Sequence, residues 1–515
     1  MHPLAKLDHA HVWHPFTQMR DWLGREPIVI VEAEGAVLRD VHGREYLDAN
    51  SSIWTNLHGH NHPKINSAIQ RQLKKIAHSS ALGLANGPAS LLAAKLAQAA
   101  NEIYDLRFTF DDSKDKAARQ SSIANRKLEK VFFSDDGSTA LEVALKLAYE
   151  FTRRSRSADS LSARNIQPRF LSLEGAYHGD TVGAVSLGHI DLFHKIYSGL
   201  LFKTDKVMSP FCYRCPFNRA KPERADAREY RKCNWECVGQ VERTFSKQKK
   251  SGNPYGAFVF EPLMQGAAGM IPQPETWLKR VSQIARGHGA LLIADEVMTG
   301  FGRTGSEFRL QADRPDGQPP EGGTPNFLFA SQHENVQPDF LCLAKGLTGG
   351  YLPMAATLTT QTVFDAFLGK YHEFKTFFHG HSYTGNQLGA AAALANLEIL
   401  QSQKSIRARQ MLETVLREEL NSLWQLPNVG DIRQVGLIAG IELVKDWRTR
   451  EPFDLRERAG IRACEAMARR GVLTRPVGNV IVLMPPYCTT PRQAKTMVNV
   501  VSAAITGTFR PNQIK

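Results

Sequence analysis

Six short apolar runs recur along the chain, and longer amphipathic stretches separate them. Within each run the hydrophobic residues are continuous rather than alternating, which is typical of strands that are buried on both faces of a sheet. The stretches between the runs show helical spacing, for example at 140–151 and 275–289. Strands that alternate with helices predict an α/β fold with a mostly parallel, doubly wound sheet. The runs lie at 131–134, 170–175, 257–262, 290–297, 340–345 and 353–360.

The pattern changes towards the C-terminus. After a long helical stretch at 388–400, strand-like and helical segments of a smaller α+β domain follow. With 515 residues, the chain is long enough for two large domains or about three average ones. We expect three parts: an N-terminal segment, 1–70, that packs with the small domain and the active site; a large domain, 71–370; and a small domain, 371–515.

Three segments interrupt the α/β pattern. They are polar or rich in Pro and Gly, and a core could not hold their backbone groups unpaired, so we predict surface insertions. They are 111–127, a cysteine-containing loop at 212–237, and 309–335.

Composition narrows the function only a little. Lys and Arg exceed Asp and Glu by 64 − 51 = 13, a basic balance that suits nucleic acid, a membrane surface or anionic small molecules. The first sixteen residues contain no apolar signal segment, and no run approaches the roughly 18 apolar residues of a membrane span. We therefore expect a soluble cytoplasmic protein.

Seven cysteines are too few, and odd in number, for a disulfide scaffold of this length. Four of them form a C-x2-C and C-x3-C pair, a spacing that can hold a structural zinc ion. The other interpretation is a polar loop that happens to contain thiols, and the spacing alone leaves both open. The four are Cys212, Cys215, Cys233 and Cys237.

A turn at Gly137-Ser138 follows the first apolar run and opens a helix. Free backbone N–H groups and the positive end of the helix dipole at such a turn suit a phosphate. An ordinary helix cap is the alternative, with Thr139 and Glu142 spaced as a capping box. Asp136 directly precedes this turn, and its orientation cannot be read from the sequence.

An acid and an amine lie at the ends of two later strands. Asp295 ends one apolar run, and Lys345 ends the next, before a Gly-rich segment. Ligands bind at the C-terminal ends of strands in open α/β sheets, so we expect the two side chains to converge. Pyridoxal 5'-phosphate (PLP) explains both, because it needs a lysine for its Schiff base and an acid beside its pyridine nitrogen. A buried structural ion pair explains the spacing equally well.

The motifs GALLIADEVMTGFGRTG (289–305) and FLCLAKGLTGG (340–350) strongly resemble those of the class III aminotransferases of PLP fold type I. The resemblance covers nearly the whole chain outside the three insertions, and it favours the PLP interpretation over an ion pair. Five further motifs are similar to the branch of this family that aminates 8-amino-7-oxononanoate to 7,8-diaminononanoate in biotin biosynthesis. They are VWHPFTQM (12–19), SSIWTNLHGHNHP (51–63), AYHGDT (176–181), FFHGHSYTGNQ (377–387) and LTRPVGNVIVLMPPY (473–487).

The resemblance implies a role for each matching residue. Lys345 is expected to carry PLP and to act as general acid and base, with its pKa lowered for that task. Asp295 is expected to lie beside the pyridine nitrogen and keep it protonated, and Tyr177 to stack on the ring. The resemblance also implies a homodimer in which each site takes residues from the partner. The expected phosphate ligands are Gly137 and Ser138, with Gly380, His381 and Ser382 from the partner.

The substrate pocket departs from the commonest family pattern. Arg475 is expected to bind the carboxylate of the keto acid. Phe16, Ile53-Trp54 and Val482 stand where many members have Tyr, a Trp pair and an aromatic residue, so the donor pocket loses polar and aromatic surface. The family's usual amino donor is S-adenosylmethionine, and a branch with motifs like these uses L-lysine. Both donors stay open, and the aliphatic walls favour lysine slightly.

Three points stay open at this stage. Arg303 in GFGRTG fits a structural role as well as a substrate contact. Another class III ω-aminotransferase activity, with a different amine or keto acid, is the nearest alternative function. A basic, zinc-stapled nucleic-acid-binding protein is a more distant one, because the chain lacks the interleaved aromatic and basic residues of such proteins.

Overall fold

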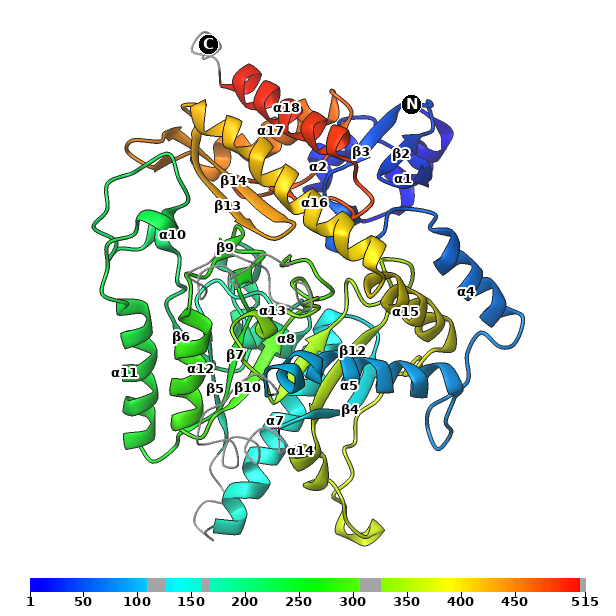
Figure 1. The fold of residues 1–515 in the computed structure, drawn as a ribbon, viewed down its shortest axis with the longest axis vertical. Helices are drawn as coiled ribbons and strands as arrows, with labels where there is room; N and C mark the ends of the chain where they lie inside the picture. Colours follow the sequence, from blue (N-terminus) through cyan, green and yellow to red (C-terminus); the bar gives the residue numbers. More distant parts are fainter. Residues whose placement is uncertain (109–125, 160–166, 306–325, 510–515) are drawn as a thin grey trace.

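A computed structural model describes residues 1–108, 126–159, 167–305 and 326–509 of the chain. Figure 1 shows a large sheet with its helices in the lower half of the molecule and a smaller antiparallel sheet above it. In the described part of the chain, no helix combines the length and the apolar character needed to cross a membrane.

The large sheet has seven strands in the order β4-β12-β11-β10-β7-β5-β6. Neighbouring strands from β11 to β6 all run parallel, whereas β12 is antiparallel to both of its neighbours. The predicted α/β fold with a mostly parallel sheet is therefore confirmed, and every predicted run contains a strand. The strands are β4 (Leu128–Ser134), β5 (Arg169–Leu173), β6 (Asp205–Val207), β7 (Tyr255–Phe260), β10 (Leu291–Asp295), β11 (Phe340–Leu343) and β12 (Ala355–Thr360).

Both faces of this sheet are buried, as continuous apolar runs require. In β7, Phe258 and Phe260 belong to one hydrophobic cluster, whereas Ala257 and Val259 belong to another. The second cluster is completed by α7 (Gly137–Asp159), which packs across β12, β11, β10 and β7. The helices on the first side are α5 (Gly87–Phe108), α11 (Glu236–Lys250), α12 (Trp277–Gly287) and α15 (Gln387–Leu400).

The smaller sheet has its own core. Its strands run in the order β13-β14-β18-β17, and three C-terminal helices pack with them. These strands are β13 (Val429–Val435), β14 (Ile438–Asp446), β17 (Pro476–Val477) and β18 (Val480–Leu483). The helices are α16 (Gln403–Leu420), α17 (Ala459–Ala468) and α18 (Pro491–Thr508).

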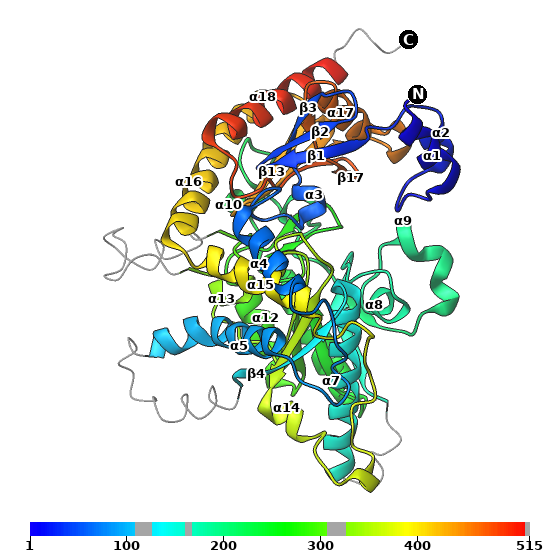
Figure 2. The same cartoon turned by 90° about the vertical axis from the view of Figure 1, so that its right-hand side faces the viewer.

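The N-terminal strands lie beside this smaller sheet, as Figure 2 shows. A four-stranded sheet joins β1 (Ile30–Glu34), β2 (Val37–Asp40) and β3 (Glu45–Asp48) to β16 (Val472–Leu473). Two helices, α1 (Pro3–His11) and α2 (Met19–Leu23), precede these strands, and α3 (Ser51–Trp54) and α4 (Pro63–Leu73) follow them. The division at 70 and 370 stays a prediction.

The insertions differ from expectation in two places. Segment 326–335 was predicted to lie on the surface, but most of it is buried. Phe327, Phe329 and α13 (Ala330–His333) pack into the core. The prediction was wrong because it gave more weight to the neighbouring Pro and Gly residues than to the aromatic residues of this segment. The cysteine loop is partly buried too. Residues 111–125 and the whole of 309–325 lie outside the described residues.

Candidate active site

Four neighbouring strands of the large sheet deliver side chains to one edge. In the spatial order β11-β10-β7-β5, the residues at or just beyond the strand ends are Lys345, Asp295, Glu261 and Tyr177-His178. The C-terminal ends of parallel strands meet at the same edge of a sheet, so the topology alone assembles this group.

These side chains line a cavity of about 250 Å³. The residues of this wall come from the four strand ends, from the start of α7, from α3 and from two loops. They are Trp54, Asp136, Gly137, Ser138, Tyr177, His178, Gly179, Glu261, Gly266, Ala267, Asp295, Val297, Met298, Thr299 and Lys345. A larger hollow of about 840 Å³ lies elsewhere, between α7 and segment 367–378. We assign the chemistry to the smaller cavity, because the lysine and the acid converge there.

Lys345 is the one lysine of this cavity wall. Its Nζ lies 5.3 Å from the centre of the Trp54 ring. Burial lowers the pKa of Lys345, and the charges of Asp295 and Glu261 act in the opposite direction. A lysine with a lowered pKa is suited to proton transfer and to Schiff-base chemistry.

Asp295 is paired with a histidine at the sheet edge. Its Oδ2 lies 2.7 Å from Nδ1 of His178, and both side chains are buried. Oδ1 accepts the N–H of Val297 at 3.1 Å. These contacts fix the carboxylate, which is the group that a protonated pyridine nitrogen requires.

The start of α7 forms a cradle, a concave surface lined by Gly137, Ser138 and Gly179, in which no large side chain fills the space. A Cβ on Gly137 would lie 2.8 Å from Val297 Cγ1, and a Cβ on Gly179 would lie 1.9 Å from Ser138 Oγ. Gly179 has φ of +117°, and the N–H of Asp180 donates to Ser138 Oγ at 3.1 Å. The helix N-terminus, two glycines and a hydroxyl fit a phosphate group.

The predicted capping box at this helix is wrong. Thr139 does not cap it, because α7 already begins at Gly137. Asp136 caps it instead: its Oδ1 accepts the N–H of Thr139 at 2.9 Å. Glu142 accepts the N–H of Gly183 at 2.9 Å, so it joins two helices rather than closing a cap.

Tyr177 reaches the cavity with both ends held. Its hydroxyl donates to Asp180 Oδ2 at 2.6 Å, and its N–H donates to Glu261 Oε1 at 3.2 Å. The ring is stacked with His194 at 6.0 Å between centroids. Burial, followed by the bond to Asp180, raises the pKa of the Tyr177 hydroxyl, so the ring stays neutral.

Several predicted residues do not line this cavity. Phe16 and Ile53 are exposed, and the Phe16 ring contacts Phe193. Arg475 is exposed and Val482 is buried in the smaller sheet. Gly380, His381 and Ser382 lie on a loop outside the cavity of their own chain, and His381 Nδ1 is 3.4 Å from Asp135 Oδ2. Their roles stay predictions.

Arg303 has a structural position. Its guanidinium is fully buried and donates to the carbonyls of Pro485 (2.9 Å) and Asn56 (3.2 Å). It also lies over the Tyr487 ring at 5.0 Å. Arg303 therefore joins three segments that surround the site.

Sequence reasoning missed Glu261, His178 and Gly179. Glu261 follows a buried strand just as Asp295 ends one, so the strand-end argument applies to it equally. Its carboxylate accepts backbone N–H groups from Tyr177 and Gly266, and burial raises its pKa to about 7. His178 and Gly179 belong to AYHGDT, but nothing in the letters indicates a contact with Asp295 or Ser138.

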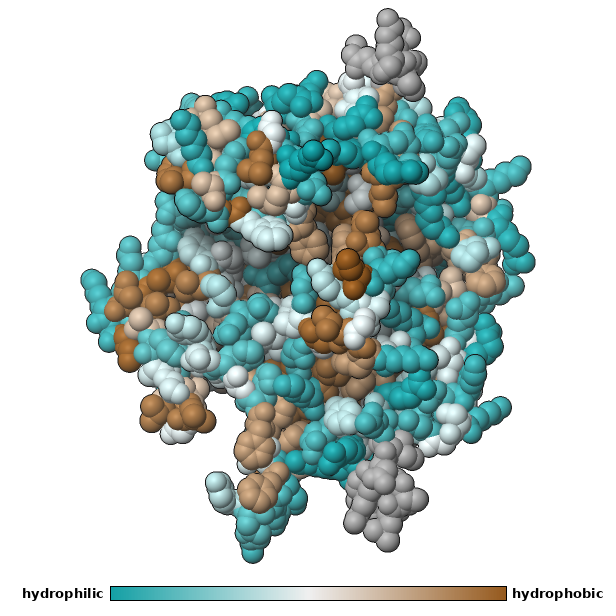
Figure 3. Space-filling view, turned by 180° about the vertical axis from the view of Figure 1, so that it is seen from behind, coloured by the Kyte–Doolittle hydropathy of each residue, from teal (hydrophilic) through white to brown (hydrophobic). Residues whose placement is uncertain are grey.

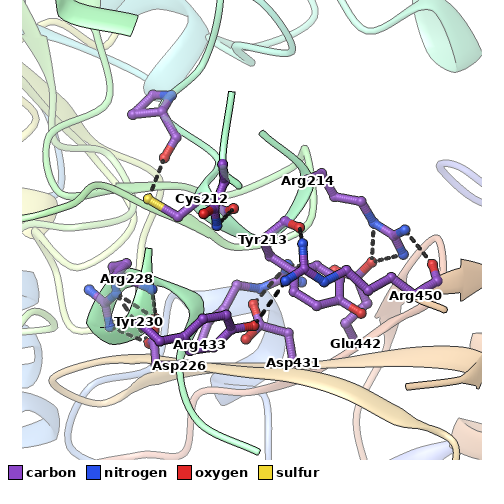
Figure 4. Close-up of polar contacts among 12 residues, drawn as sticks. Cys212, Tyr213, Arg214, Asp226, Arg228, Tyr230, Asp431, Arg433, Glu442 and Arg450 are labelled. Carbon is purple, nitrogen blue, oxygen red and sulfur yellow. Dashed lines mark hydrogen bonds and ion pairs between the residues drawn. The ribbon is translucent and has the colours of Figure 1, made fainter. Parts of the chain in front are cut away.

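The cysteine loop contributes no residue to the cavity wall. Polar contacts join it to the smaller sheet, as Figure 4 shows. Arg214 donates to Glu442 at 2.5 and 2.9 Å, and Arg433 donates to the other oxygen of Glu442 at 2.5 Å. Asp431 lies 3.7 Å from Arg433 in the same buried cluster. These contacts explain why a polar loop is partly buried.

The four loop cysteines are free thiols in this structure. Burial raises the pKa of Cys212 to about 12 and that of Cys237 to about 11. Among the described residues, no group of three or more His, Cys, Asp or Glu side chains is arranged to hold a metal ion. The structural zinc site at these four cysteines stays a prediction.

Comparison with known proteins gives one family over almost the whole chain. The family model described as aminotransferase class-III matches residues 20–320 and 322–505. A curated relative from Nitratidesulfovibrio vulgaris, named adenosylmethionine-8-amino-7-oxononanoate aminotransferase, is 45% identical over 502 residues, which are 98% of this chain and 81% of that protein.

Solved structures agree with this match. The crystal structure of adenosylmethionine-8-amino-7-oxononanoate aminotransferase from Methanocaldococcus jannaschii is similar with a TM-score of 0.79 and 36% identity, covering 98% of both chains. An amine transaminase from an uncultivated Pseudomonas species, in its PLP-bound form, has a TM-score of 0.78 and 30% identity over 97% of this chain and 99% of the other.

Proposed function

The chain belongs to the class III aminotransferases, and we propose that it is a PLP-dependent enzyme that aminates 8-amino-7-oxononanoate to 7,8-diaminononanoate in biotin biosynthesis. The observation that carries this proposal is the convergence of Lys345, Asp295 and the Gly137-Ser138 cradle on one cavity. The names of the curated relative and of the M. jannaschii structure support the substrate.

The residues of the cavity fit PLP. When bound, PLP supplies an electron sink that stabilises negative charge on the carbon of an attached amine. Gly137, Ser138, Gly179 and the N-terminus of α7 would hold its phosphate, and Asp295, fixed by His178, would keep its pyridine nitrogen protonated. Tyr177, which lines the same cavity, would support the ring.

Lys345 moves the proton that transamination requires. Its Nζ lines the cavity, and burial lowers its pKa, so a neutral amine would be available to take a proton from Cα of the donor and deliver it to C4′ of the cofactor. The same amine serves both half-reactions, because donor and acceptor use one cavity in turn.

Substrate recognition is the least constrained part of the proposal, because Trp54 alone of the four residues expected to contact substrate here lines the cavity of its own chain. Arg475 would bind the carboxylate of 8-amino-7-oxononanoate, and Trp54, with Phe16 and Ile53, would form the wall that the amino donor meets. The donor is S-adenosylmethionine or L-lysine. The name of the curated relative supports the first, and the aliphatic Ile53 favours the second.

The enzyme acts in the cytoplasm as a homodimer. Large apolar side chains are exposed, among them Leu82 (91%), Tyr371 (92%) and Phe378 (76%). Figure 3 shows hydrophobic side chains gathered in patches on one face. A partner that covers such patches would also bring its Gly380–Ser382 loop to the cavity, which that loop does not line in its own chain.

Substitution of Lys345 tests the proposal. Lys345→Ala should remove the PLP absorption band that borohydride fixes and lower turnover by about 1,000-fold. Lys206→Ala is the matched control, because burial also lowers the pKa of the half-buried Lys206, which lies outside the cavity. Turnover that persists in the Lys345 variant would overturn the proposal.

Donor, acceptor and assembly have separate tests. Rapid mixing of the PLP form with S-adenosylmethionine or L-lysine should convert it to the pyridoxamine form with one of them. If 8-amino-7-oxononanoate then fails to restore the PLP form, another class III activity is correct. Analytical ultracentrifugation should give the mass of two chains, and Phe378→Asp should shift it to one.

A further inference from the structure

A left-handed turn lies next to the cavity. Ser51, Ser52, Ile53 and Trp54 have φ values of +46°, +49°, +64° and +69°. Residues with a Cβ rarely adopt this region, and a β-branched residue such as Ile53 is especially unfavourable there. Four in succession persist only where the surrounding structure enforces them, and such strain is concentrated at functional sites.

Asp48 enforces this conformation. Its Oδ1 accepts the N–H groups of Asn50 (3.1 Å) and Ser52 (3.2 Å), and its Oδ2 accepts the Ser52 hydroxyl (3.2 Å). His60 Nε2 lies 3.0 Å from the same Oδ2. Burial opposes ionisation of Asp48, but the bonds from His60, Ser52 and Asn50 lower its pKa below the usual value, so the carboxylate stays charged.

The turn presents Trp54 to the cavity. The indole N–H of Trp54 donates to Asn50 Oδ1 at 2.8 Å, and its ring centre lies 5.3 Å from Lys345 Nζ. A Cβ on Gly266 would lie 3.4 Å from this ring, so Trp54 is packed closely against the cavity wall.

The segment beyond the turn packs against the loop after Lys345. A Cβ on Gly350, which has φ of +87°, would lie 2.7 Å from Asn56 Cα. The turn therefore has no room to relax towards that loop, and its geometry decides where the indole lies.

We propose that Asp48 is a positioning residue for transamination: it holds the left-handed turn that places Trp54 across the donor side of the cavity. This inference rests on the proposed function and deepens it. Asp48 does not line the cavity, so it acts on the donor only through Trp54. A relaxed turn would withdraw the indole while leaving Lys345, Asp295 and the phosphate cradle in place.

The variant Asp48→Asn tests this proposal. An amide offers one acceptor oxygen where the carboxylate offers two, so bonds to Ser52 or His60 are lost. Loss of a buried bond to a charged acceptor corresponds to about a tenfold change in an equilibrium. We therefore expect the donor KM to rise about tenfold with kcat changed less than threefold, measured with whichever of S-adenosylmethionine and L-lysine the wild-type enzyme accepts.

Asp40→Asn is the matched control. Asp40 is also buried and also accepts several donors: the N–H groups of His42 and Arg44, the Arg44 side chain and the Tyr46 hydroxyl. It lies in the same N-terminal sheet, but it holds no residue of the turn. Its variant should lose thermal stability as Asp48→Asn does and leave the donor KM unchanged.

A double-mutant cycle with Trp54→Phe isolates the proposed route. If Asp48 acts through the indole, Asp48→Asn should change the donor KM less than twofold in the Trp54→Phe background. Additive effects, or an equal rise of KM in Asp40→Asn, would show that Asp48 contributes only to stability.

A spectroscopic measurement keeps this test separate from the proposed function. PLP bound beside Lys345 should quench the fluorescence emission of Trp54. The quenching due to Trp54 is the difference in PLP-induced quenching between each protein and its Trp54→Phe counterpart. This quenching should decrease in Asp48→Asn and persist in Asp40→Asn. This result needs no turnover, so an enzyme that accepts neither donor would refute the donor assignment and not the role of Asp48.

Discussion

His178 and Asp295 form a buried pair across the sheet edge, with Nδ1 and Oδ2 2.7 Å apart. His178 follows β5 and Asp295 ends β10, and β7 lies between these two strands, so the pair bridges the end of the strand that precedes Glu261. An acid held in this way has one orientation, and the pyridine nitrogen of PLP would meet it without rearrangement.

Asp295→Asn should lower transaminase turnover by about 100- to 1,000-fold, because an amide cannot stabilise the positive charge of the protonated ring. Turnover and the absorption spectrum of bound PLP are the measurements. Asp205→Asn is the control, since Asp205 accepts bonds from Arg169 and Tyr255 at the far edge of the same sheet. A loss of turnover common to both variants would point to general damage of the sheet.

Gly179→Ala should empty the phosphate cradle, because its Cβ would lie 1.9 Å from Ser138 Oγ. We expect the Kd of PLP to rise at least tenfold, which corresponds to a loss of about 1.4 kcal/mol of binding free energy. The variant should therefore lose more PLP on dialysis than the wild type. Gly43→Ala separates the clash from backbone strain: Gly43 has φ of +77°, and its Cβ would meet nothing within 4 Å. Equal retention in the two variants would contradict the cradle.

His58 should make stability depend on pH. Burial lowers its pKa to about 3, so the folded protein holds it neutral while the unfolded chain binds a proton below about 6.5. Its contribution is present above pH 6.5 and is lost as the pH falls towards 3. Between pH 7 and 5 this amounts to about 2 kcal/mol of unfolding free energy.

Urea unfolding at pH 7 and 5 measures this effect. His58→Gln should show a smaller loss on acidification, and the exposed His372→Gln should match the wild type. An unchanged pH dependence in His58→Gln would exclude His58 as its source.

Asp431→Asn should stabilise the protein at pH 8 by about 1 kcal/mol. Burial raises the pKa of Asp431 well above its usual value, although Arg433 acts in the opposite direction, so the charged form disfavours folding above that pKa. The gain should shrink as the pH falls towards the unfolded pKa of about 3.9 and vanish below it, where the carboxyl is protonated in the folded and the unfolded protein alike. Urea midpoints at pH 8 and 5 test this, and a loss of stability at pH 8 would mean that the ion pair with Arg433 dominates.

The sequence predicted what depends on local pattern. The apolar runs identified six strands of the large sheet, and strand ends identified Asp295 and Lys345, because burial and topology act on each run in the same way. Contacts between residues that are distant in sequence could not be predicted. The contact of His178 with Asp295 depends on the order of the strands in the sheet. The packing of segment 326–335 depends on core residues that lie outside that segment.

The conformation of the turn at Ser51–Trp54 could not be predicted from the sequence either. Its letters include no glycine, so nothing local predicts positive φ, and the conformation follows from Asp48, His60 and the carbonyl of Met484, which accepts the Ser51 hydroxyl at 2.7 Å. Met484 is distant in sequence, so this contact depends on the fold.

Asp295 and Glu261 place two carboxylates in the cavity wall around a single lysine, and the charge of Asp295 adds to burial in raising the pKa of Glu261. A protonated pyridine ring bound there would offset this negative charge, so the loaded enzyme should resist heat and proteases better than the empty one. Vitamin B6 supply during growth would then set how much of the protein accumulates, and a preparation from starved cells would look like a folding defect.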